Sequence, residues 1–271
     1  MDKRKYDGGE APAGDYAGLT ADSDYPASGL MGSNLIYFPV IYSTMDAARD
    51  QAIAKASEGT VILAETQTGG KGRLSRTWIS PSGNVFLSVL LYPEKAALPY
   101  LTMLAAVALA RAIEKQLGLP TGLKWPNDVL IGGKKVAGIL LETNAGGRET
   151  LFAVMGIGIN VNIAPGEYEA IATTAVSLTE LAGAAVSRRN LVKALLREIN
   201  SLYGDLGDGA DLFTEWRQRL ATLGSRVTIT AGKEIVEGVA EEVNPDGSLM
   251  LRLDDHTLRR IVAGDLKLRH K

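Results

Sequence analysis

Three glycines and three positive charges lie together in GGKGRLSRT, residues 69–77, a segment that we name the basic loop. Lys71, Arg73 and Arg76 supply charge for an anion, and glycines let backbone N–H groups approach a phosphate closely. The loop is not a P-loop, because the spacing G-x-x-x-x-G-K-[ST] is absent. It is not a dinucleotide-binding fingerprint either, because no glycine-opened helix with a downstream acidic residue is evident. A solvent-exposed hairpin explains the same residues, so both interpretations stay open.

A second charged group lies in KWPNDVLIGGKKVAGILLE, residues 124–142. Its Pro-Asn-Asp sequence predicts a tight turn that places Lys124 and Asp128 near the ends of two strands. The Gly-Gly pair at 132–133 predicts a hairpin, and Lys135 lies just after it. Lysines at an exposed hairpin tip need no ligand, so this simpler explanation also stays open.

A third element is GIGINVN, residues 156–162, where two glycines interrupt an apolar strand. Glycine inside a strand often marks a site where a ligand or another part of the chain approaches closely. Gly156 and Gly158 therefore predict that some group packs directly against this strand.

The composition is that of an ordinary globular protein, with 46% hydrophobic and 22% charged residues in a chain of 271. Its net charge of −2 does not favour general attraction to nucleic acid or acidic lipid, so we expect neither DNA nor a membrane as a partner. The absence of cysteine excludes disulfides and thiolate chemistry and suits a reducing cytoplasm. The chain has only 2 histidines, so a histidine base or a histidine-rich metal site is not expected. Any chemistry must then use lysine, arginine, carboxylates, hydroxyls, amides and the backbone.

The chain divides into three regions. Residues 1–33 are rich in Gly, Ala, Asp, Ser and Pro without an apolar period, which predicts a disordered tail. Residues 34–222 alternate apolar strands with helices and form the candidate catalytic domain. Residues 223–271 carry short alternating strands, which are typical of a small SH3-like β-barrel.

Two helices carry clear signals. Ser43, with Asp46 three residues later, is similar to a capping box and predicts a helix that ends at Gly59. The apolar pattern over residues 98–117 predicts a long helix that ends at Gly118. The apolar run within it is too short to span a bilayer, and the N-terminus lacks the apolar core of a signal peptide.

The three elements, taken in order, resemble the catalytic domain of bacterial biotin–protein ligases, also called biotin–[acetyl-CoA-carboxylase] ligases. That family carries G-R-G-R-x-G-R-x-W, K-W-P-N-D and K-x-x-G-I-L, which stand here as GKGRLSRTW (residues 70–78), KWPND (124–128) and KVAGIL (135–140). The resemblance covers residues 35–265 and extends to Ser43, Thr44 and Gln67. Two departures are Lys71, which keeps the charge but not the guanidinium fork, and Ser75, which replaces a glycine.

The resemblance implies an α+β fold, with a class II synthetase-like biotin–lipoate ligase domain built on a mixed sheet and a small SH3-like β-barrel after it. It also implies an enzyme that uses ATP to convert biotin into biotinyl-5′-AMP and then transfers biotin to a lysine of a biotin carboxyl carrier protein. Magnesium would accompany the triphosphate and be held mainly by phosphate oxygens and water, so we expect no metal site made of protein ligands.

Site residues follow from the resemblance, position by position. Arg73 and Lys135 are the catalytic candidates, since a carboxylate attacking a phosphate needs fixed positive charge. The candidates for biotin binding are Ser43, Thr44, Gln67, Lys71, Gly72, Arg73 and Lys135. The candidates for ATP and adenylate binding are Arg73, Arg76, Trp78, Lys124, Asn127, Asp128 and Asn160.

Several alternatives remain at this point. Ser43 as a simple helix cap and Trp78 as a core anchor explain those two residues without a ligand. A lipoate–protein ligase shares the implied fold, and a nucleic-acid-binding module would use basic loops and a small barrel in another way. The unpatterned first 33 residues favour a ligase without an N-terminal DNA-binding domain. The family also includes homodimers, but nothing in the sequence assigns an interface.

Overall fold

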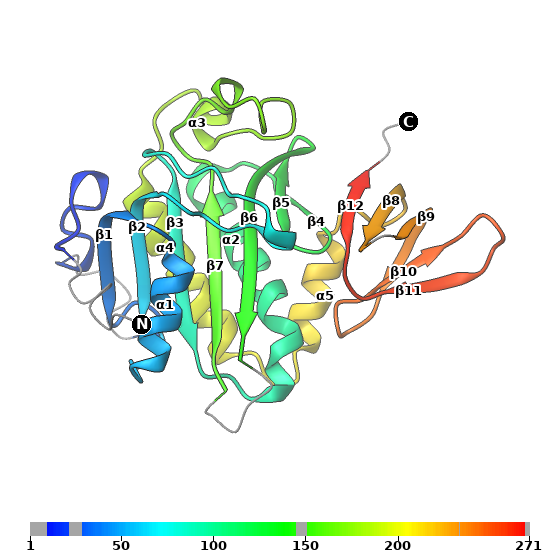
Figure 1. Ribbon diagram of the computed structural model, residues 1–271, viewed down its shortest axis with the longest axis horizontal. Coiled ribbons are helices and arrows are strands. Elements are labelled where there is room, and N and C mark those ends of the chain that lie inside the picture. Colours follow the sequence, from blue (N-terminus) through cyan, green and yellow to red (C-terminus); the bar gives the residue numbers. More distant parts are fainter. Residues whose placement is uncertain (1–9, 22–28, 145–150, 233, 269–271) are drawn as a thin grey trace.

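A seven-stranded mixed sheet forms the centre of the computed structural model, which describes residues 10–21, 29–144, 151–232 and 234–268 (Figure 1). The strands are β1 (Leu35–Ile41), β2 (Val61–Gln67), β3 (Val85–Leu91), β4 (Gly122–Lys124), β5 (Asp128–Ile131), β6 (Lys134–Thr143) and β7 (Ala153–Ile159). Their order is β1-β2-β3-β7-β6-β5-β4, with β1 and β2 parallel and the other neighbours antiparallel. The predicted hairpin at Gly132-Gly133 is confirmed, because β5 and β6 pair across it.

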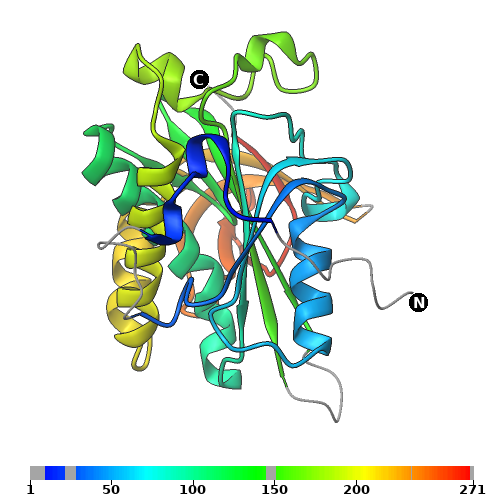
Figure 2. The same ribbon diagram turned by 90° about the vertical axis from the view of Figure 1, so that its left-hand side faces the viewer.

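Helices cover both faces of this sheet (Figure 2). Helix α1 (Thr44–Ile53) lies on one face, and α2 (Leu101–Leu117), α4 (Arg188–Gly204) and α5 (Ala210–Gln218) lie on the other, while α3 (Leu178–Ala182) is a short helix near the end of β7. Successive side chains of β2 point to opposite faces of the sheet. Val61 and Leu63 belong to the large core, whereas Ile62 and Ala64 pack with α1 on the other face. The sheet is therefore buried on both sides.

The predicted long helix is α2, and it ends as expected at Gly118, which takes a left-handed φ of 67°. Together with the preceding 3-10 turn it forms a 23-residue helical stretch, Lys95–Leu117, which is long and apolar enough to cross a membrane by length and composition alone. Most of this stretch is buried inside the protein, and α2 packs against α4, α5 and the sheet. Its apolar character is accounted for by its place at the centre of the core.

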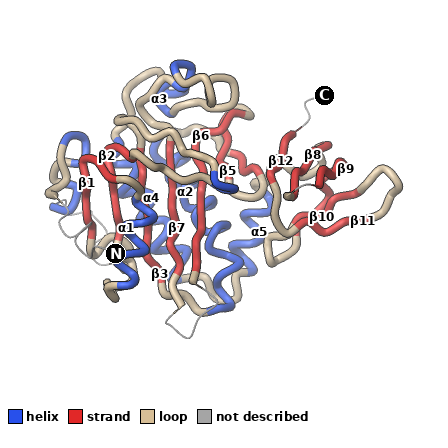
Figure 3. The backbone as a smooth tube through the Cα atoms, in the orientation of Figure 1, coloured by secondary structure: helices blue, strands red, loops and turns tan. Residues whose placement is uncertain are grey.

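A second, antiparallel sheet follows α5 (Figure 3). It contains β8 (Arg226–Ala231), β9 (Glu234–Val243), β10 (Leu249–Arg252), β11 (Leu258–Ile261) and β12 (Asp265–Leu268), in the order β11-β10-β9-β8-β12. Together, the mixed sheet with its helices and this five-stranded sheet confirm the predicted fold class. We name the second unit the C-terminal sheet.

Helix α1 departs from the sequence prediction at both ends. It stops at Ile53 rather than at Gly59, because the Ala56 N–H bonds to the Gln51 carbonyl and Lys55 takes a left-handed φ of 61°. Ser43 occupies the N-cap position, but its side chain makes no capping hydrogen bond. The capping-box prediction is therefore wrong, and the Ser43 hydroxyl is left for another role.

The prediction of a disordered tail over residues 1–33 is wrong for residues 10–21 and 29–33, while residues 1–9 and 22–28 lie outside the described part of the chain. Tyr16, Leu19 and Met31 are fully buried in the large core, and Glu10 forms an antiparallel bridge with Tyr37 of β1. Three apolar side chains spaced this irregularly have no helical or strand period. Their contribution therefore comes from tertiary packing that the composition hides.

Replacement of Tyr16 by alanine tests whether this segment belongs to the fold. Removing a fully buried aromatic side chain costs about 3–5 kcal/mol, so the Tyr16→Ala protein should lose that much free energy of unfolding in urea titrations. Tyr42 is 54% exposed, and Tyr42→Ala is the matched control, for which we expect a much smaller loss. Equal stability of the two variants would show that the N-terminal segment is a dispensable appendage.

Candidate functional site

A cavity of about 1050 Å³ opens on the α1 face of the sheet, between the start of α1, the basic loop, strands β6 and β7, and strand β12. All of the residues predicted from the sequence line it: Ser43, Thr44, Gln67, Lys71, Gly72, Arg73, Arg76, Trp78, Lys124, Asn127, Asp128, Lys135 and Asn160. In Figure 1 the chain that follows β2 crosses in front of β7 and β6 and covers this face. Segments far apart in sequence thus meet at one place.

Trp78 forms part of the cavity wall, and two glycines let it lie there. Gly138 of β6 and Gly158 of β7 are directly opposite each other in the sheet. A Cβ atom added to Gly158 would come within 2.6 Å of the Trp78 ring, and one added to Gly138 within 2.8 Å. The sequence prediction of a close approach at Gly158 is therefore confirmed, and the approaching group is an indole packed flat on the two strands. At Gly156 the approaching group is the Met45 side chain.

Thr44 and Gln67 belong to a chain of hydrogen bonds at one end of the cavity. The Gln67 Oε1 accepts from the Thr44 backbone N–H at 2.9 Å and from the Thr44 hydroxyl at 3.1 Å. Ser88 donates to the Thr44 hydroxyl at 2.9 Å, and the Gln67 amide donates to the Ser80 hydroxyl at 3.1 Å. These bonds fix the orientation of both side chains before any ligand arrives.

Two buried polar atoms at the cavity have no partner. Three side-chain atoms among the described residues are buried without a hydrogen bond: the Ser43 hydroxyl and the Trp78 indole N–H, whose residues line the cavity, and the Asn84 amide nitrogen, whose residue does not. Burying an unsatisfied polar group costs about 1–3 kcal/mol. Because two such atoms lie at the same cavity, a ligand with polar groups is the natural partner for both of them.

The lysines of the site are held by carboxylates. Lys135 lies 2.6 Å from Asp128, and Lys124 lies 3.9 Å from the other oxygen of the same carboxylate. The Lys135 ammonium also lies 5.0 Å from the centre of the Trp78 ring, within the range of a cation–π contact. On the other side of the cavity Lys71 pairs with Asp46 of α1.

The two arginines of the basic loop reach the C-terminal sheet. Arg73 donates to the Asn127 side chain at 3.2 Å and to the Gly264 carbonyl at 3.3 Å, while Arg76 makes two hydrogen bonds to Asp265. Burial lowers the pKa of Arg73 from its ordinary value, against the opposing effect of nearby carboxylates. The hydrogen bonds with Arg76 hold the pKa of Asp265 below its ordinary value. The Arg76 side chain is 62% exposed, so this ion pair adds little to stability and mainly orients the loop.

The basic loop is a folded hairpin rather than a loose segment. Gly72 and Trp78 donate backbone hydrogen bonds to Arg76 and Gly70, at 2.7 Å and 2.9 Å. Ser75 takes a φ of 60°, in the left-handed region that favours glycine. This accounts for the glycine at the matching position of the ligase motif. The segment is thus a hairpin whose residues 74–77 are exposed, as that interpretation expected, but it also lines the cavity, which a purely solvent-exposed hairpin would not do.

The two asparagines of the site are held by backbone groups. The Asn127 amide donates to the Ile139 carbonyl of β6 at 2.7 Å. Asn160 is buried, and its backbone N–H donates to the Val136 carbonyl at 2.8 Å. The Asn127 side chain and the Asn160 backbone are therefore each held at the end of a strand.

Sequence reasoning missed part of the cavity wall. It did not find that Asp46 is the partner of Lys71. It also missed two stretches of the lining, the residues of β12 and residues 170–175, which lie next to Lys135 through backbone hydrogen bonds. Asp46 carried a signal, because it was recognised in the sequence, but only as a helix-cap residue. The other contacts join residues separated by up to 191 positions, and no local pattern reveals them.

The cavity thus combines seven lysines and arginines, apolar strand walls and a prearranged polar end. Such a site suits a ligand that has an apolar body, hydrogen-bonding groups at one end and strong negative charge at the other. Among the described residues there is no group of three or more His, Cys, Asp or Glu side chains that could hold a metal ion.

Known proteins share both parts of the chain. Residues 37–160 match the biotin/lipoate A/B protein ligase family, and residues 222–269 match the biotin protein ligase C terminal domain. The bifunctional ligase/repressor BirA of Bacillus subtilis is 35% identical over 247 residues, which cover 88% of this chain and 75% of that protein. The chain belongs to the biotin protein ligase family. A biotin–[acetyl-CoA-carboxylase] ligase of Mycobacterium tuberculosis is also 35% identical, over 77% of this chain and 79% of that protein.

A solved structure agrees with this membership of the biotin protein ligase family. The biotin protein ligase from Aquifex aeolicus in complex with biotin and ATP superposes with a TM-score of 0.75 at 28% identity, and covers 88% of this chain and 99% of that one. The likeness extends over the mixed sheet and the C-terminal sheet together.

Substitution of Gly158 by alanine tests whether the Trp78 indole packs against this glycine. The added methyl would displace the Trp78 ring, so iodide should quench more of the tryptophan fluorescence in Gly158→Ala than in the parent protein. Trp125 and Trp216, the other tryptophans, are 1% and 2% exposed and contribute little quenching. Gly166→Ala is the matched control, because a Cβ atom there meets open space. Unchanged quenching in Gly158→Ala would contradict the described packing.

Proposed function

We propose that this protein activates biotin with ATP to biotinyl-5′-AMP and then transfers biotin to a specific lysine of a biotin carboxyl carrier protein. The observation that carries the proposal is the cavity itself, which is lined by an unpartnered Ser43 hydroxyl, an oriented Thr44–Gln67 pair, and the cations of the basic loop and the β5–β6 hairpin. Biotin has a polar ureido head, an apolar body and a carboxylate tail. Its shape and polarity match that arrangement.

The first step joins two anions. The biotin carboxylate oxygen attacks the α-phosphorus of ATP, a new P–O bond forms, and the bond to the β-phosphate breaks with release of pyrophosphate. Charge on the reacting oxygens is stabilised by cations that are already in place, which is the main source of catalysis in phosphoryl-type transfer. Lys135 and Arg73 take this role, and Asp128 holds Lys135 in position at 2.6 Å.

The second step transfers the acyl group. The neutral amine of the acceptor lysine attacks the acyl carbon of biotinyl-5′-AMP, the C–O bond to phosphate breaks, AMP leaves and a proton is released. The basic loop, which covers the cavity in this proposal, excludes water that would hydrolyse the intermediate. Arg73 and Lys71 hold the hairpin closed through Asn127 and Asp46.

The nucleotide lies beside Trp78, Arg76, Lys124, Asn127 and Asn160 in this proposal, and magnesium enters with the triphosphate and is held by phosphate oxygens and water. The cytoplasm, where ATP is available, is the location that goes with this proposal.

A lipoate ligase activity is less well supported. The head of lipoate is a dithiolane ring without N–H or C=O groups, so it would leave the buried Ser43 hydroxyl unsatisfied. Purified protein, ATP and magnesium should therefore yield an adenylate with biotin but not with lipoate, as detected by mass spectrometry. Formation of lipoyl-AMP alone would support the other ligase activity, and absence of both adenylates would contradict the proposed function.

Ser43→Ala separates ligand binding from helix capping. Because the hydroxyl caps nothing and is unsatisfied in the free protein, its loss should not lower the stability to urea. It should weaken biotin binding about tenfold, which corresponds to about 1.4 kcal/mol for one buried hydrogen bond. Ser177 is the matched control, since its hydroxyl does cap α3. Ser177→Ala should lose about 1 kcal/mol of stability and bind biotin normally in calorimetric titrations. A stability loss without a binding loss in Ser43→Ala would refute the assigned role.

Lys135→Gln tests the catalytic charge. Removal of one preorganised electrostatic contact costs about 2.7–4 kcal/mol, so single-turnover formation of biotinyl-5′-AMP should slow by roughly 100–1,000-fold. Lys95→Gln, at an exposed lysine that does not line the cavity, should retain close to the parent rate. Equal rates for both variants would leave Lys135 as a surface lysine.

A further inference from the structure

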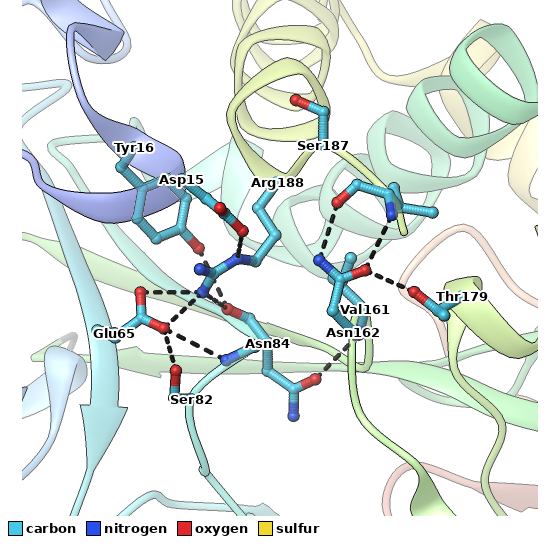
Figure 4. Close-up of polar contacts among 12 residues, drawn as sticks. Asp15, Tyr16, Glu65, Ser82, Asn84, Val161, Asn162, Thr179, Ser187 and Arg188 are labelled. Atoms are coloured by element: carbon cyan, nitrogen blue, oxygen red, sulfur yellow. Dashed lines mark hydrogen bonds and ion pairs between the residues drawn. The ribbon is translucent and has the colours of Figure 1, made fainter. Parts of the chain in front are cut away.

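Arg188 is a buried arginine outside the cavity, at the start of α4, and its side chain is only 6% exposed. Figure 4 shows its guanidinium at the centre of a polar cluster. One terminal nitrogen donates to both oxygens of Glu65, at 2.9 Å each, and to the Asn84 carbonyl at 3.1 Å. Its Nε donates to Asp15 at 2.9 Å.

Tyr16 closes this cluster from the N-terminal segment. The Arg188 guanidinium lies 4.7 Å from the centre of the Tyr16 ring, and the Tyr16 hydroxyl donates to the Asn84 carbonyl at 3.1 Å. The arginine is therefore paired with two carboxylates and stacked on an aromatic ring. Removing one partner from such a buried set leaves an uncompensated charge.

Glu65 connects the cluster to the chain that leaves the basic loop. It lies on β2, two residues before Gln67, and accepts from the Ser82 hydroxyl and from the Gly83 backbone N–H at 3.3 Å. Residues 82–84 join the segment that carries Trp78 to strand β3. Arg188, by orienting Glu65, thus fixes one end of the segment that covers the cavity.

Asn84 connects the same cluster to the end of β7. Its side-chain oxygen accepts from the Val161 N–H at 2.9 Å (Figure 4). The Gly83 carbonyl accepts from the Asn162 N–H at 2.9 Å. Asn160 immediately precedes these two anchored residues and lines the cavity. Arg188 is therefore connected by hydrogen bonds to the segments that carry two residues of the cavity wall, Trp78 and Asn160.

We propose that Arg188 is a positioning residue for the nucleotide, acting through Glu65 on the segment behind Trp78 and through Asn84 on Asn160. This inference rests on the proposed function, because Trp78 and Asn160 belong to the nucleotide half of that assignment. Thr44, at the biotin end, is held instead by its hydrogen bonds with Gln67 and Ser88. Loss of Arg188 should consequently affect ATP more than biotin.

Arg188→Met and Arg188→Lys test the proposal by steady-state adenylation at varied ATP and varied biotin. Small misplacements of positioning groups cost up to about 100-fold, so we expect kcat/KM for ATP to fall roughly 10–100-fold in Arg188→Met, mainly through a higher KM, with KM for biotin near the parent value. Arg188→Lys keeps the charge facing Glu65 but not the fork that reaches Asn84 and Asp15, so its defect should be smaller. Equal rises of both KM values, or no rise, would overturn the proposal.

Arg111→Met is the matched control for loss of an internal ion pair. Arg111 lies on α2, bonds to Glu215 at 3.1 Å and does not line the cavity. Its loss should lower the melting temperature without changing either KM. A rise in the KM for ATP in Arg111→Met as well would show that general destabilisation, not positioning, causes the effect.

Amide hydrogen exchange supplies a readout that does not depend on activity. Exchange at Gly83, Val161 and Asn162 should accelerate at least tenfold in Arg188→Lys, while exchange in α1 stays at the parent rate. Unchanged exchange at these amides would overturn the inference even if the enzyme is active. If the parent protein makes no biotinyl-5′-AMP, the proposed function fails, and faster exchange would then establish only the structural link.

Discussion

Mutual repulsion among cations is the constraint that the site must overcome. Lys71, Arg73, Arg76, Lys124 and Lys135 all face one cavity with apolar walls. Three carboxylates hold most of them: Asp46, Asp128 and Asp265. Each of these carboxylates comes from a different part of the fold, so the charge cluster exists only when α1, the β4–β5 turn and the C-terminal sheet are all in place. The anionic groups of the ligand then enter a field that has already been assembled, which is the condition for strong electrostatic catalysis.

The sheet makes this assembly possible because it has glycines, which lack side chains, at the positions that face the cavity. Gly138 and Gly158 form a flat area on which the Trp78 indole lies, and the indole in turn faces the Lys135 ammonium at 5.0 Å. The C-terminal sheet is part of the same device, since Gly264 and Asp265 accept hydrogen bonds from the two arginines of the basic loop. Removal of that sheet would release one side of the cover, which explains why a small separate unit accompanies the catalytic domain.

The sequence indicates the chemistry of the site well because its charged motifs are compact. GKGRLSRTW and KWPND each keep their residues within nine positions, and the charged residues of both motifs line the cavity together with Trp78 and Asn127. Sequence reasoning failed where a residue's role depends on a distant partner. Ser43 has the spacing of a cap but does not act as one, and Tyr16 lies in a segment of disordered composition yet is fully buried. In both cases tertiary packing decides the outcome, and neither local propensity nor periodicity contains that information.

Retention of the intermediate tests the central claim most directly, because a cavity built from fixed cations and a closed hairpin should hold biotinyl-5′-AMP as well as form it. The protein would be incubated with biotin, ATP and magnesium, passed through a desalting column, and analysed by mass spectrometry for adenylate in the protein fraction. We predict close to one biotinyl-5′-AMP per chain, which disappears when a biotin carboxyl carrier protein is added and reappears there as biotinyl-lysine. Adenylate found entirely in the small-molecule fraction, or none at all, would contradict this account.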